Sequence, residues 1–319
     1  MKTKLTEMFG IEYPIVQSGM QWLAVPQLAA AVCNAGGIGT INVTCWPTLD
    51  EFADALDEMN SLTNKPYIVN ISLAPTQRLD NEEIRKTIRL CGEKHVAAIE
   101  TSAEDPREFI ADIKSAGMRH FHKCPNYKVS MSMERKGLDG VIIAGYEVGG
   151  HPSADGVGTF VIARRCAADM KIPVIAAGGV YTGEDIKKYM DLGASGVQMG
   201  TRFVATYECD ADDRFKQAYI DAKQEDVTII KSPVGMPGRA LVNNFIDSMR
   251  DGGKKPFKCI FHCVKTCEQE KTPYCIAAAL INAMKGNLER GFAFCGENVS
   301  RVNNIVSVHD LISSLQREF

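Results

Sequence analysis

Short apolar runs alternate with amphipathic stretches along the first two-thirds of the chain. The runs are rich in Val, Ile and Ala and many end in glycine, which is typical of buried parallel strands that open into loops. We predict strands at Pro14–Ser18, Gly37–Asn42, Tyr67–Leu73, Val96–Thr101, Arg119–Lys123, Gly140–Gly145, Val174–Ala177 and Gly196–Gly200. Amphipathic helices are predicted between them at Val25–Asn34, Thr48–Leu62, Asn81–Cys91, Pro106–Ala116, Lys128–Lys136, Val157–Asp169 and Thr182–Leu192.

Eight strands with intervening helices are the number that closes a parallel barrel. The rival architecture, an open doubly wound sheet, would carry a Gly-x-Gly-x-x-Gly turn after its first strand. The nearest glycine cluster, Gly36–Gly39, lies where a helix passes into a strand, and glycine is common there as a helix cap. We therefore predict an α/β protein with a (β/α)8 TIM barrel and a C-terminal insertion or lid region.

The regular pattern weakens after the eighth strand. Residues 209–260 are polar and contain several Pro and Gly residues, a composition that favours loops or a lid. We predict a barrel core at residues 1–208 and an irregular, Cys-containing lid or insertion at residues 209–275. Residues 276–319 are predicted to form C-terminal helices that pack on the barrel, one at Ile276–Lys285 and one at Val308–Leu315.

Composition narrows the possible partners. The chain has 319 residues, of which 45% are hydrophobic, and a formal net charge of −3. This balance gives no electrostatic reason to expect a nucleic acid or an anionic membrane as a partner. No apolar run is long enough to span a membrane, and the first residues lack the apolar segment of a signal peptide. We expect a cytoplasmic protein that acts on a small molecule, with a homodimer left open as its assembly.

Two glycine-rich strand ends form the first candidate binding site. One is Pro173-Val-Ile-Ala-Ala-Gly-Gly179 and the other is Gly196-Val-Gln-Met-Gly-Thr-Arg-Phe203. Adjacent strand ends without side-chain bulk let several backbone N–H groups converge on one anion. In TIM barrels, the loops after strands 7 and 8 commonly bind phosphate. A cofactor phosphate is therefore predicted here, while helix caps and tight turns remain the alternative for these glycines.

Candidate reactive residues follow other strands. His151 comes directly after Gly149 and Gly150 at the end of the sixth strand, where it can accept a proton or donate a hydrogen bond. A loop histidine without a function is the alternative. Asn70 is a polar residue inside an apolar strand, so it binds either backbone or a ligand. Lys123 near the barrel mouth favours an anionic group, or else is a solvated lysine.

The backbone and side chain at Gly19 and Met20 could lie against an aromatic ring system, and core packing explains Met20 about as well. A separate cluster contains four of the eleven cysteines, Cys259, Cys263, Cys267 and Cys275, with His262 among them. A zinc ion or an iron–sulfur centre would explain this density. The spacing differs from the usual Cys-x₂-Cys knuckle, so a packed helical stripe of thiols is the alternative.

An ordered set of motifs resembles the nitronate monooxygenase family, formerly called 2-nitropropane dioxygenases. Flavin-dependent enoyl-[acyl-carrier-protein] reductases and some NAD(P)H:quinone reductases are related to that family. The resemblance covers about residues 5–205 and resumes weakly at Pro233–Arg239. The motifs are Pro14-Ile-Val-Gln-Ser-Gly-Met20, Ala35-Gly-Gly-Ile-Gly39, Gly145-Tyr-Glu-Val-Gly-Gly-His151, Ala176-Ala-Gly-Gly179 and Gln198-Met-Gly-Thr-Arg-Phe203.

The resemblance implies a TIM barrel that binds FMN without a covalent bond. It implies that the phosphate is bound by Gly178, Gly179, Gly200 and Thr201. It also implies that the flavin ring or ribityl chain is contacted by Gly19, Met20, Asn70, Lys123, Gly149, Gly150 and Gln198. His151 matches the family histidine that serves as the base toward nitroalkanes.

The implied activity is oxidation of alkyl nitronates with O₂. The second candidate is an NAD(P)H-dependent FMN reductase that acts on an enoyl thioester or a quinone, and the third is a flavin- or metal-binding module without enzymatic activity. The segment Pro152–Thr159 is longer than in the enoyl reductases, which places that activity second. The tail with the cysteines is not part of the family's core pattern.

Overall fold

Eight parallel strands form the centre of the molecule. The computed structural model describes residues 1–74, 80–261, 263, 265 and 267–319. The strands are β1 (Ile15–Gln17), β2 (Thr40–Asn42), β3 (Ile68–Ser72), β4 (Ala98–Ser102), β5 (Arg119–Cys124), β6 (Gly140–Ala144), β7 (Val174–Ala177) and β8 (Gly196–Met199). Their order is β1-β8-β7-β6-β5-β4-β3-β2. A parallel bridge between Val16 and Ile38 joins β1 to the approach of β2, so the TIM barrel prediction is confirmed.

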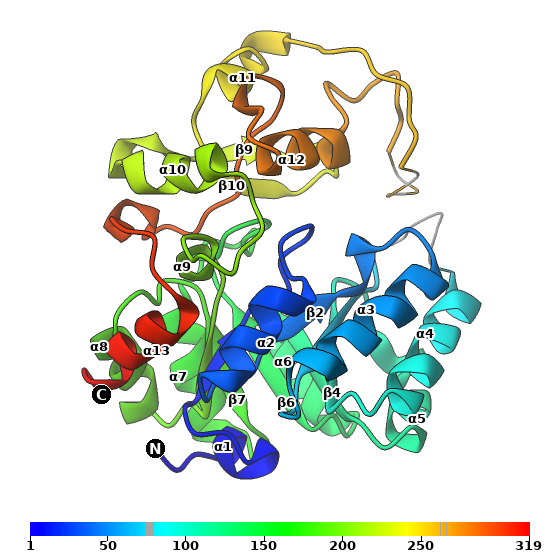
Figure 1. The fold of residues 1–319 in the computed structure, drawn as a ribbon, viewed down its shortest axis with the longest axis vertical. Coiled ribbons are helices and arrows are strands. Elements are labelled where there is room, and N and C mark those ends of the chain that lie inside the picture. The colour runs from blue at the N-terminus through cyan, green and yellow to red at the C-terminus, as the bar shows by residue number, and fades with distance from the viewer. Residues whose placement is uncertain (75–79, 262, 264, 266) are drawn as a thin grey trace.

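Helices surround the strands as expected for this fold (Figure 1). They are α2 (Pro26–Asn34), α3 (Leu49–Leu62), α4 (Asn81–Glu93), α5 (Ile110–Ser115), α6 (Tyr127–Arg135), α7 (Thr159–Asp169) and α8 (Gly183–Asp191). A further helix, α13 (Val308–Gln316), contacts α2 and α8. Helix α1 (Lys4–Phe9) inserts the buried Leu5 into the apolar cluster that contains Val16 and Phe121 of the strands. Buried apolar side chains between strands and helices make up the rest of the barrel core.

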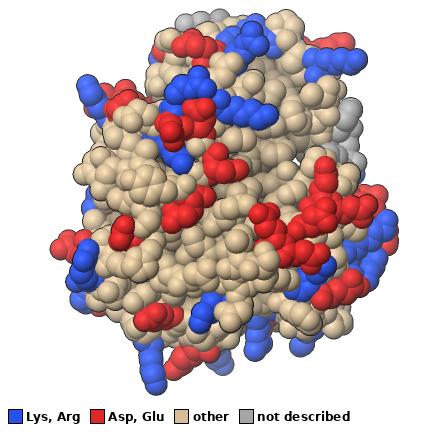
Figure 2. Space-filling model, in the orientation of Figure 1, with Lys and Arg blue, Asp and Glu red and all other residues tan. Residues whose placement is uncertain are grey.

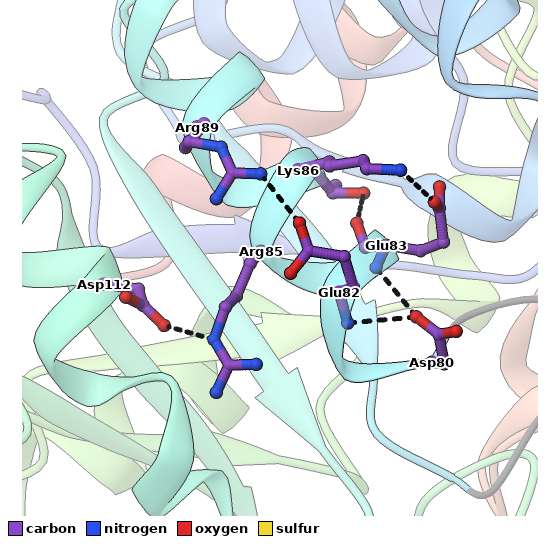
Figure 3. A network of polar contacts seen from close by, with 8 residues as sticks. Asp80, Glu82, Glu83, Arg85, Lys86, Arg89 and Asp112 are labelled. Carbon is purple, nitrogen blue, oxygen red and sulfur yellow. Dashed lines mark hydrogen bonds and ion pairs between the residues drawn. The ribbon is translucent and has the colours of Figure 1, made fainter.

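Helix α4 illustrates how local chemistry sets an element boundary (Figure 3). The Asp80 carboxylate accepts hydrogen bonds from the backbone N–H groups of Glu82 and Glu83, at 2.9 and 3.0 Å, and so caps the helix. Arg85 pairs with Asp112 of α5 at 3.2 Å. Solvent-exposed pairs of this kind contribute about 0–1 kcal/mol each, so the buried Ile84 and Ile88 hold α4 in place more than its charges do.

A second layer lies above the C-terminal ends of the strands (Figure 1). We call residues 213–294 the cap. It contains α10 (Asp213–Asp221), an antiparallel pair of β9 (Val227–Lys231) and β10 (Pro237–Leu241), α11 (Asn244–Asp247) and α12 (Ile276–Met284). An apolar cluster of its own includes Phe245, Tyr274 and Phe292. The link between barrel and cap is α9 (Thr201–Val204).

The cap differs from the expectation in two respects. The predicted irregular region includes the β9–β10 hairpin, and α12 belongs to the cap instead of packing on the ring of helices. The physical reason for the second difference is that Ala279, Ile276 and Leu280 of α12 pack into the cluster around Phe245 and Phe292. The helix predicted at Val308–Leu315, in contrast, lies on the barrel as α13. The three-part division of the chain stays a prediction.

The surface agrees with a nearly balanced charge. On the face drawn in Figure 2, basic and acidic side chains are interspersed over both layers, with broad uncharged areas between them. No helix among the described residues has the length and apolar character needed to cross a membrane.

Candidate active site

A cavity of about 1160 Å³ lies between the barrel mouth and the cap. All residues that the sequence predicts to contact a cofactor line it, together with His151. From the barrel these are Gly19, Met20, Asn70, Lys123, Gly149, Gly150, Gly178, Gly179, Gln198, Gly200 and Thr201. The cap contributes apolar side chains that include Met236, Phe261, Ile276, Leu280 and Phe294. One end of the cavity is therefore polar and rich in glycine, and the other is apolar.

The two glycine-rich strand ends meet at this cavity. Gly178 and Gly179 have φ angles of 106° and 73°, which L side chains rarely adopt. Within the described part of the chain, the backbone N–H groups of Gly179, Gly200 and Thr201 donate no hydrogen bond to the protein. The loops are held from behind, since the Thr201 hydroxyl accepts a bond from the Gly296 N–H at 2.8 Å. Free N–H groups in a fixed turn fit a phosphate.

Glu100, which was not among the predicted site residues, lies at the centre of a polar cluster at the floor of the cavity. Its carboxylate is fully buried and pairs with the Lys123 ammonium at 3.1 Å. It accepts hydrogen bonds from the Asn70 amide at 2.7 Å and from the Gln198 amide at 2.5 Å. Three predicted cofactor contacts, from β3, β5 and β8, are thus held by one side chain of β4. The available signal was a charged residue within the apolar run Val96–Thr101.

The Gln198 amide leaves one buried atom without a partner. Its nitrogen bonds to Glu100, which fixes the orientation of the amide. Its Oε1 is buried and has no hydrogen-bond partner among the described residues. A buried acceptor without a donor is costly, so this atom fits a ligand that presents an N–H or O–H group. The isoalloxazine ring and ribityl chain of a flavin both carry such donors.

Two non-glycine residues at the cavity wall, in the loops after β1 and β4, have strained backbone conformations. Trp22 has a φ of 67° and its buried indole N–H has no partner in the described structure. Ala103, which follows β4, has a φ of 73°. Both residues line the cavity, and such conformations of non-glycine residues gather at ligand sites. Gly19 is required in the loop after β1 because a Cβ there would lie 2.5 Å from the Cβ of Asn70.

His151 is fixed mainly by the cap. Its Nε2 lies 2.9 Å from the Ser232 hydroxyl, and the Phe294 ring meets its ring edge-on with centroids 5.2 Å apart. Burial lowers the pKa of His151 to about 4, so the imidazole is neutral at pH 7. Neither partner could be predicted from the sequence, because Ser232 and Phe294 are distant from His151 in the chain.

Arg239 ties the His151 loop to β10. Its backbone N–H donates to the Gly150 carbonyl at 2.8 Å. Its guanidinium donates to the Tyr146 carbonyl at 2.8 Å and lies over the Tyr146 ring, 4.7 Å from the centroid. The arginine is buried, and cation–π contacts strengthen when the cation is desolvated. The cap and the His151 loop therefore form one structural unit.

The cysteine cluster gives the metal prediction no support. Cys259, Cys263, Cys267 and Cys275 are free thiols. In the described ranges, no group of three or more His, Cys, Asp or Glu side chains is placed to hold a metal ion. The pKa of the Cys263 thiol is raised to about 11, mainly by burial and secondly by the nearby Cys275. His262 lies outside the described residues. The metal site at these four cysteines stays a prediction.

Comparisons with known sequences identify the family that the chain resembles. A family model described as nitronate monooxygenase matches residues 2–318. The "(3aS,4S,5R,7aS)-5-hydroxy-7a-methyl-1-oxo-octahydro-1H-indene-4-carboxyl-CoA dehydrogenase" of Rhodococcus jostii is 34% identical over 253 residues, which cover 79% of this chain and 69% of that protein. A probable nitronate monooxygenase of Staphylococcus saprophyticus is 29% identical over 290 residues, covering 79% of this chain and 81% of that protein.

Solved structures show the same architecture. FabK from Thermotoga maritima superposes with a TM-score of 0.85 and 30% sequence identity, covering 100% of this chain and 96% of that chain. The nitroalkane oxidase from Streptomyces ansochromogenes superposes with a TM-score of 0.80 and 23% identity, covering 99% and 98% of the two chains. The second likeness is one of fold alone.

Proposed function

The chain belongs to the nitronate monooxygenase family of oxidoreductases, and we propose that it binds FMN and exchanges hydride with an acyl thioester. The proposal rests on the volume of the cavity and on the apolar side chains of the cap that cover it, which we call the roof. Its volume of about 1160 Å³ exceeds the roughly 300–1,000 Å³ of pockets that hold one drug-sized ligand. A flavin and a substrate with an extended apolar part fit together there.

The glycine-rich end would hold the cofactor phosphate at Gly178, Gly179, Gly200 and Thr201. The polar floor of Asn70, Lys123 and Gln198 would bind the ring or the ribityl chain, with Gly19, Met20, Gly149 and Gly150 against the flavin. FMN, when bound, would carry an electron pair between NAD(P)H and a substrate carbon. The protein's own contribution is to bind, orient and shield the reacting groups.

The apolar roof favours a thioester with an acyl chain over a small nitroalkane as the substrate. Met236, Ile276, Leu280 and Phe294 line the part of the cavity that the cap provides. Burying an acyl chain there gains about 25 cal/mol per Å² of apolar surface. A small nitronate would leave most of this surface in contact with water. The relative named as a carboxyl-CoA dehydrogenase and the FabK structure agree with this substrate class.

The second candidate function is oxidation of an alkyl nitronate with O₂. The neutral imidazole of His151 favours it, because a neutral ring can serve as a base toward a nitroalkane or donate a hydrogen bond to a nitronate oxygen. The relatives named as probable nitronate monooxygenases also favour it. A homodimeric assembly and a cytoplasmic location stay predictions, as does the choice between NADH and NADPH.

Anaerobic spectroscopy separates these functions. The purified protein should show the absorbance of a flavin, and NADH or NADPH should bleach it rapidly. Addition of an enoyl thioester such as crotonyl-CoA should then restore the absorbance. Bleaching by a nitronate but not by a nicotinamide would contradict the thioester proposal and support the second function. A flavoprotein inert to all these reagents would contradict both.

A further inference from the structure

The hydrogen bond between Ser232 and His151 defines which imidazole nitrogen carries the proton. We propose that Ser232 fixes the tautomer of His151 so that Nδ1–H faces the cavity as a hydrogen-bond donor to a substrate oxygen. Under this proposal Ser232 is a positioning residue, and His151 is a donor instead of a base. The assignment of the substrate oxygen rests on the proposed function.

Among the residues that the structure describes, Ser232 has a single acceptor within reach for its hydroxyl proton. The residue is 2% exposed, and its oxygen lies 2.9 Å from His151 Nε2. The only other contact of that oxygen in the described structure comes from the Val234 N–H at 3.5 Å, which is a donor. A buried hydroxyl proton without an acceptor is costly. The Ser232 O–H therefore donates to Nε2.

The backbone holds Ser232 in this position. Its N–H donates to the Met236 carbonyl at 3.0 Å and its carbonyl accepts from the Gly235 N–H at 2.9 Å, so Ser232 lies in a closed turn between β9 and β10. Phe294 packs edge-on against the imidazole, which limits rotation of the ring. The turn and the aromatic contact together keep Nε2 directed at the hydroxyl.

The other nitrogen follows from this arrangement. A neutral imidazole carries one proton, so an acceptor at Nε2 requires the proton on Nδ1. Nδ1 has no hydrogen-bond partner in the described structure and does not belong to the buried, unpartnered atoms. Since His151 lines the cavity, this N–H is available to a ligand there.

A hydrogen-bond donor at this position favours substrates that present an oxygen atom with negative or developing negative charge. It stabilises negative charge that develops on a thioester carbonyl oxygen, as an oxyanion-hole donor does. It would equally bind an oxygen of a preformed nitronate. It cannot accept the carbon-bound proton whose removal is the first step in the conversion of a neutral nitroalkane.

Nitrogen-15 NMR of the histidine side chains tests the tautomer directly. In the wild-type protein we expect His151, assigned by its absence in His151→Asn, to show a protonated Nδ1 and an unprotonated Nε2 at pH 7. In Ser232→Ala we expect a mixture of tautomers. Ser314→Ala is the matched control, because its hydroxyl donates to the Leu311 carbonyl on α13, away from the cavity. A protonated Nε2 in the wild type would overturn the proposal.

Two amide substitutions test the role of the donor. The Asn amide nitrogen can take the place of Nδ1–H, whereas the Gln amide nitrogen reaches toward the position of Nε2. We expect His151→Asn to keep kcat within about tenfold, and His151→Gln to lose roughly 10²–10³-fold, the usual loss for one oxyanion donor. Equal and large losses in both variants would indicate a base and contradict the proposal.

The outcome is distinguishable from failure of the proposed function. The NMR measurement needs no substrate, so a wild type with Nδ1–H but no turnover of thioesters would refute the proposed substrate and leave the tautomer intact. Conversely, thioester turnover with a protonated Nε2 would refute the tautomer and leave the function intact. If the protein instead oxidises nitronates, a donor at Nδ1 predicts that it turns over the preformed nitronate and little of the neutral nitroalkane.

Discussion

Glu100 and Lys123 form a buried ion pair at the floor of the cavity. The carboxylate has no exposed surface, whereas the lysine side chain is 25% exposed toward the cavity. A buried charge is tolerated when it is paired and fully hydrogen-bonded, and removal of one partner leaves the other uncompensated. The pair thus contributes to folding and, through Asn70 and Gln198, to the shape of the site.

We expect Lys123→Met to lower the free energy of unfolding by about 3–5 kcal/mol, because Glu100 then keeps a buried charge without its partner. Urea unfolding at pH 7 measures this loss. The double variant Lys123→Met with Glu100→Gln should recover most of the stability, since neither charge remains. If the double variant is as unstable as the single one, packing of the lysine stem explains the loss and the ion pair does not.

The two tryptophans offer an optical test of where the flavin binds. The chain contains only Trp22 and Trp46, and both line the cavity. Binding of FMN to the apoprotein should therefore quench nearly all of the intrinsic tryptophan emission. Trp22→Phe should leave a weaker emission that FMN still quenches. Emission that stays constant on saturation with FMN would place the cofactor elsewhere.

At the scale of elements, the strands and helices of the barrel were predictable because each is a local pattern. A run such as Val174–Ala177 is apolar on both faces, and the helices around it repeat apolar residues every three to four positions. In the β9–β10 hairpin, β9 is a β-branched run, but β10 lacks a strand signal because it begins with Pro237 and Gly238. Besides its pairing with β9, β10 forms bridges to Gly150 and Phe294, which are distant in the sequence.

The same contrast applies to the site. The glycine loops and His151 could be identified because strand ends in a barrel converge on one rim. Ser232 could not, because its relevance depends on the cap folding back over the barrel. Glu100 lies between these cases, since its charge is visible in the sequence but its three partners come from three other strands.

The glycine loop after β7 allows a matched pair of substitutions. Gly179 has a φ of 73° and faces the cavity, whereas Gly193 has a φ of 94° and a Cβ there would meet only Ala167, at 3.6 Å. Alanine in a left-handed conformation costs about 1–2 kcal/mol, so both variants should lose similar stability. Only Gly179→Ala should also weaken FMN binding, by about tenfold or more, since a charge-assisted hydrogen bond contributes about 1.5–3 kcal/mol.

Fluorescence titration with FMN and thermal unfolding of the apoproteins measure the two effects separately. Equal FMN affinity in Gly179→Ala and Gly193→Ala would show that the loop after β7 does not contact the phosphate. A loss of affinity in both would indicate that strain in the barrel, and not the local N–H groups, controls binding.

For the whole molecule, the free energy of unfolding depends on three histidines that are neutral in the folded state. His151 lies under the cap. His120 and His122 lie on β5. The Nε2 atom of His120 and the Nδ1 atom of His122 each contact the Thr101 hydroxyl, at 2.8 and 2.9 Å. Burial lowers the pKa of each of the three histidines to about 4. None of them can take up a proton near pH 6 without loss of folding energy.

The sign of the resulting pH dependence follows from proton linkage. In the unfolded chain a histidine titrates near pH 6.5 and binds a proton that the folded state does not accept until about pH 4. The free energy of unfolding should therefore be highest above pH 6.5 and fall as the pH decreases from 6.5 toward 4. Each histidine accounts for about 2 kcal/mol between pH 7 and pH 5.

Urea unfolding at pH 7, 6 and 5 measures this slope, and His122→Asn isolates one contribution. The Asn side chain can still reach the Thr101 hydroxyl from the position of Nδ1 but does not titrate, so about a third of the slope should disappear. An unchanged slope would mean that His122 is protonated in the folded protein, with the imidazolium donating to the Thr101 hydroxyl. Because the same linkage acts on His151, acidification should also weaken the contact between the cap and the barrel loop that carries it.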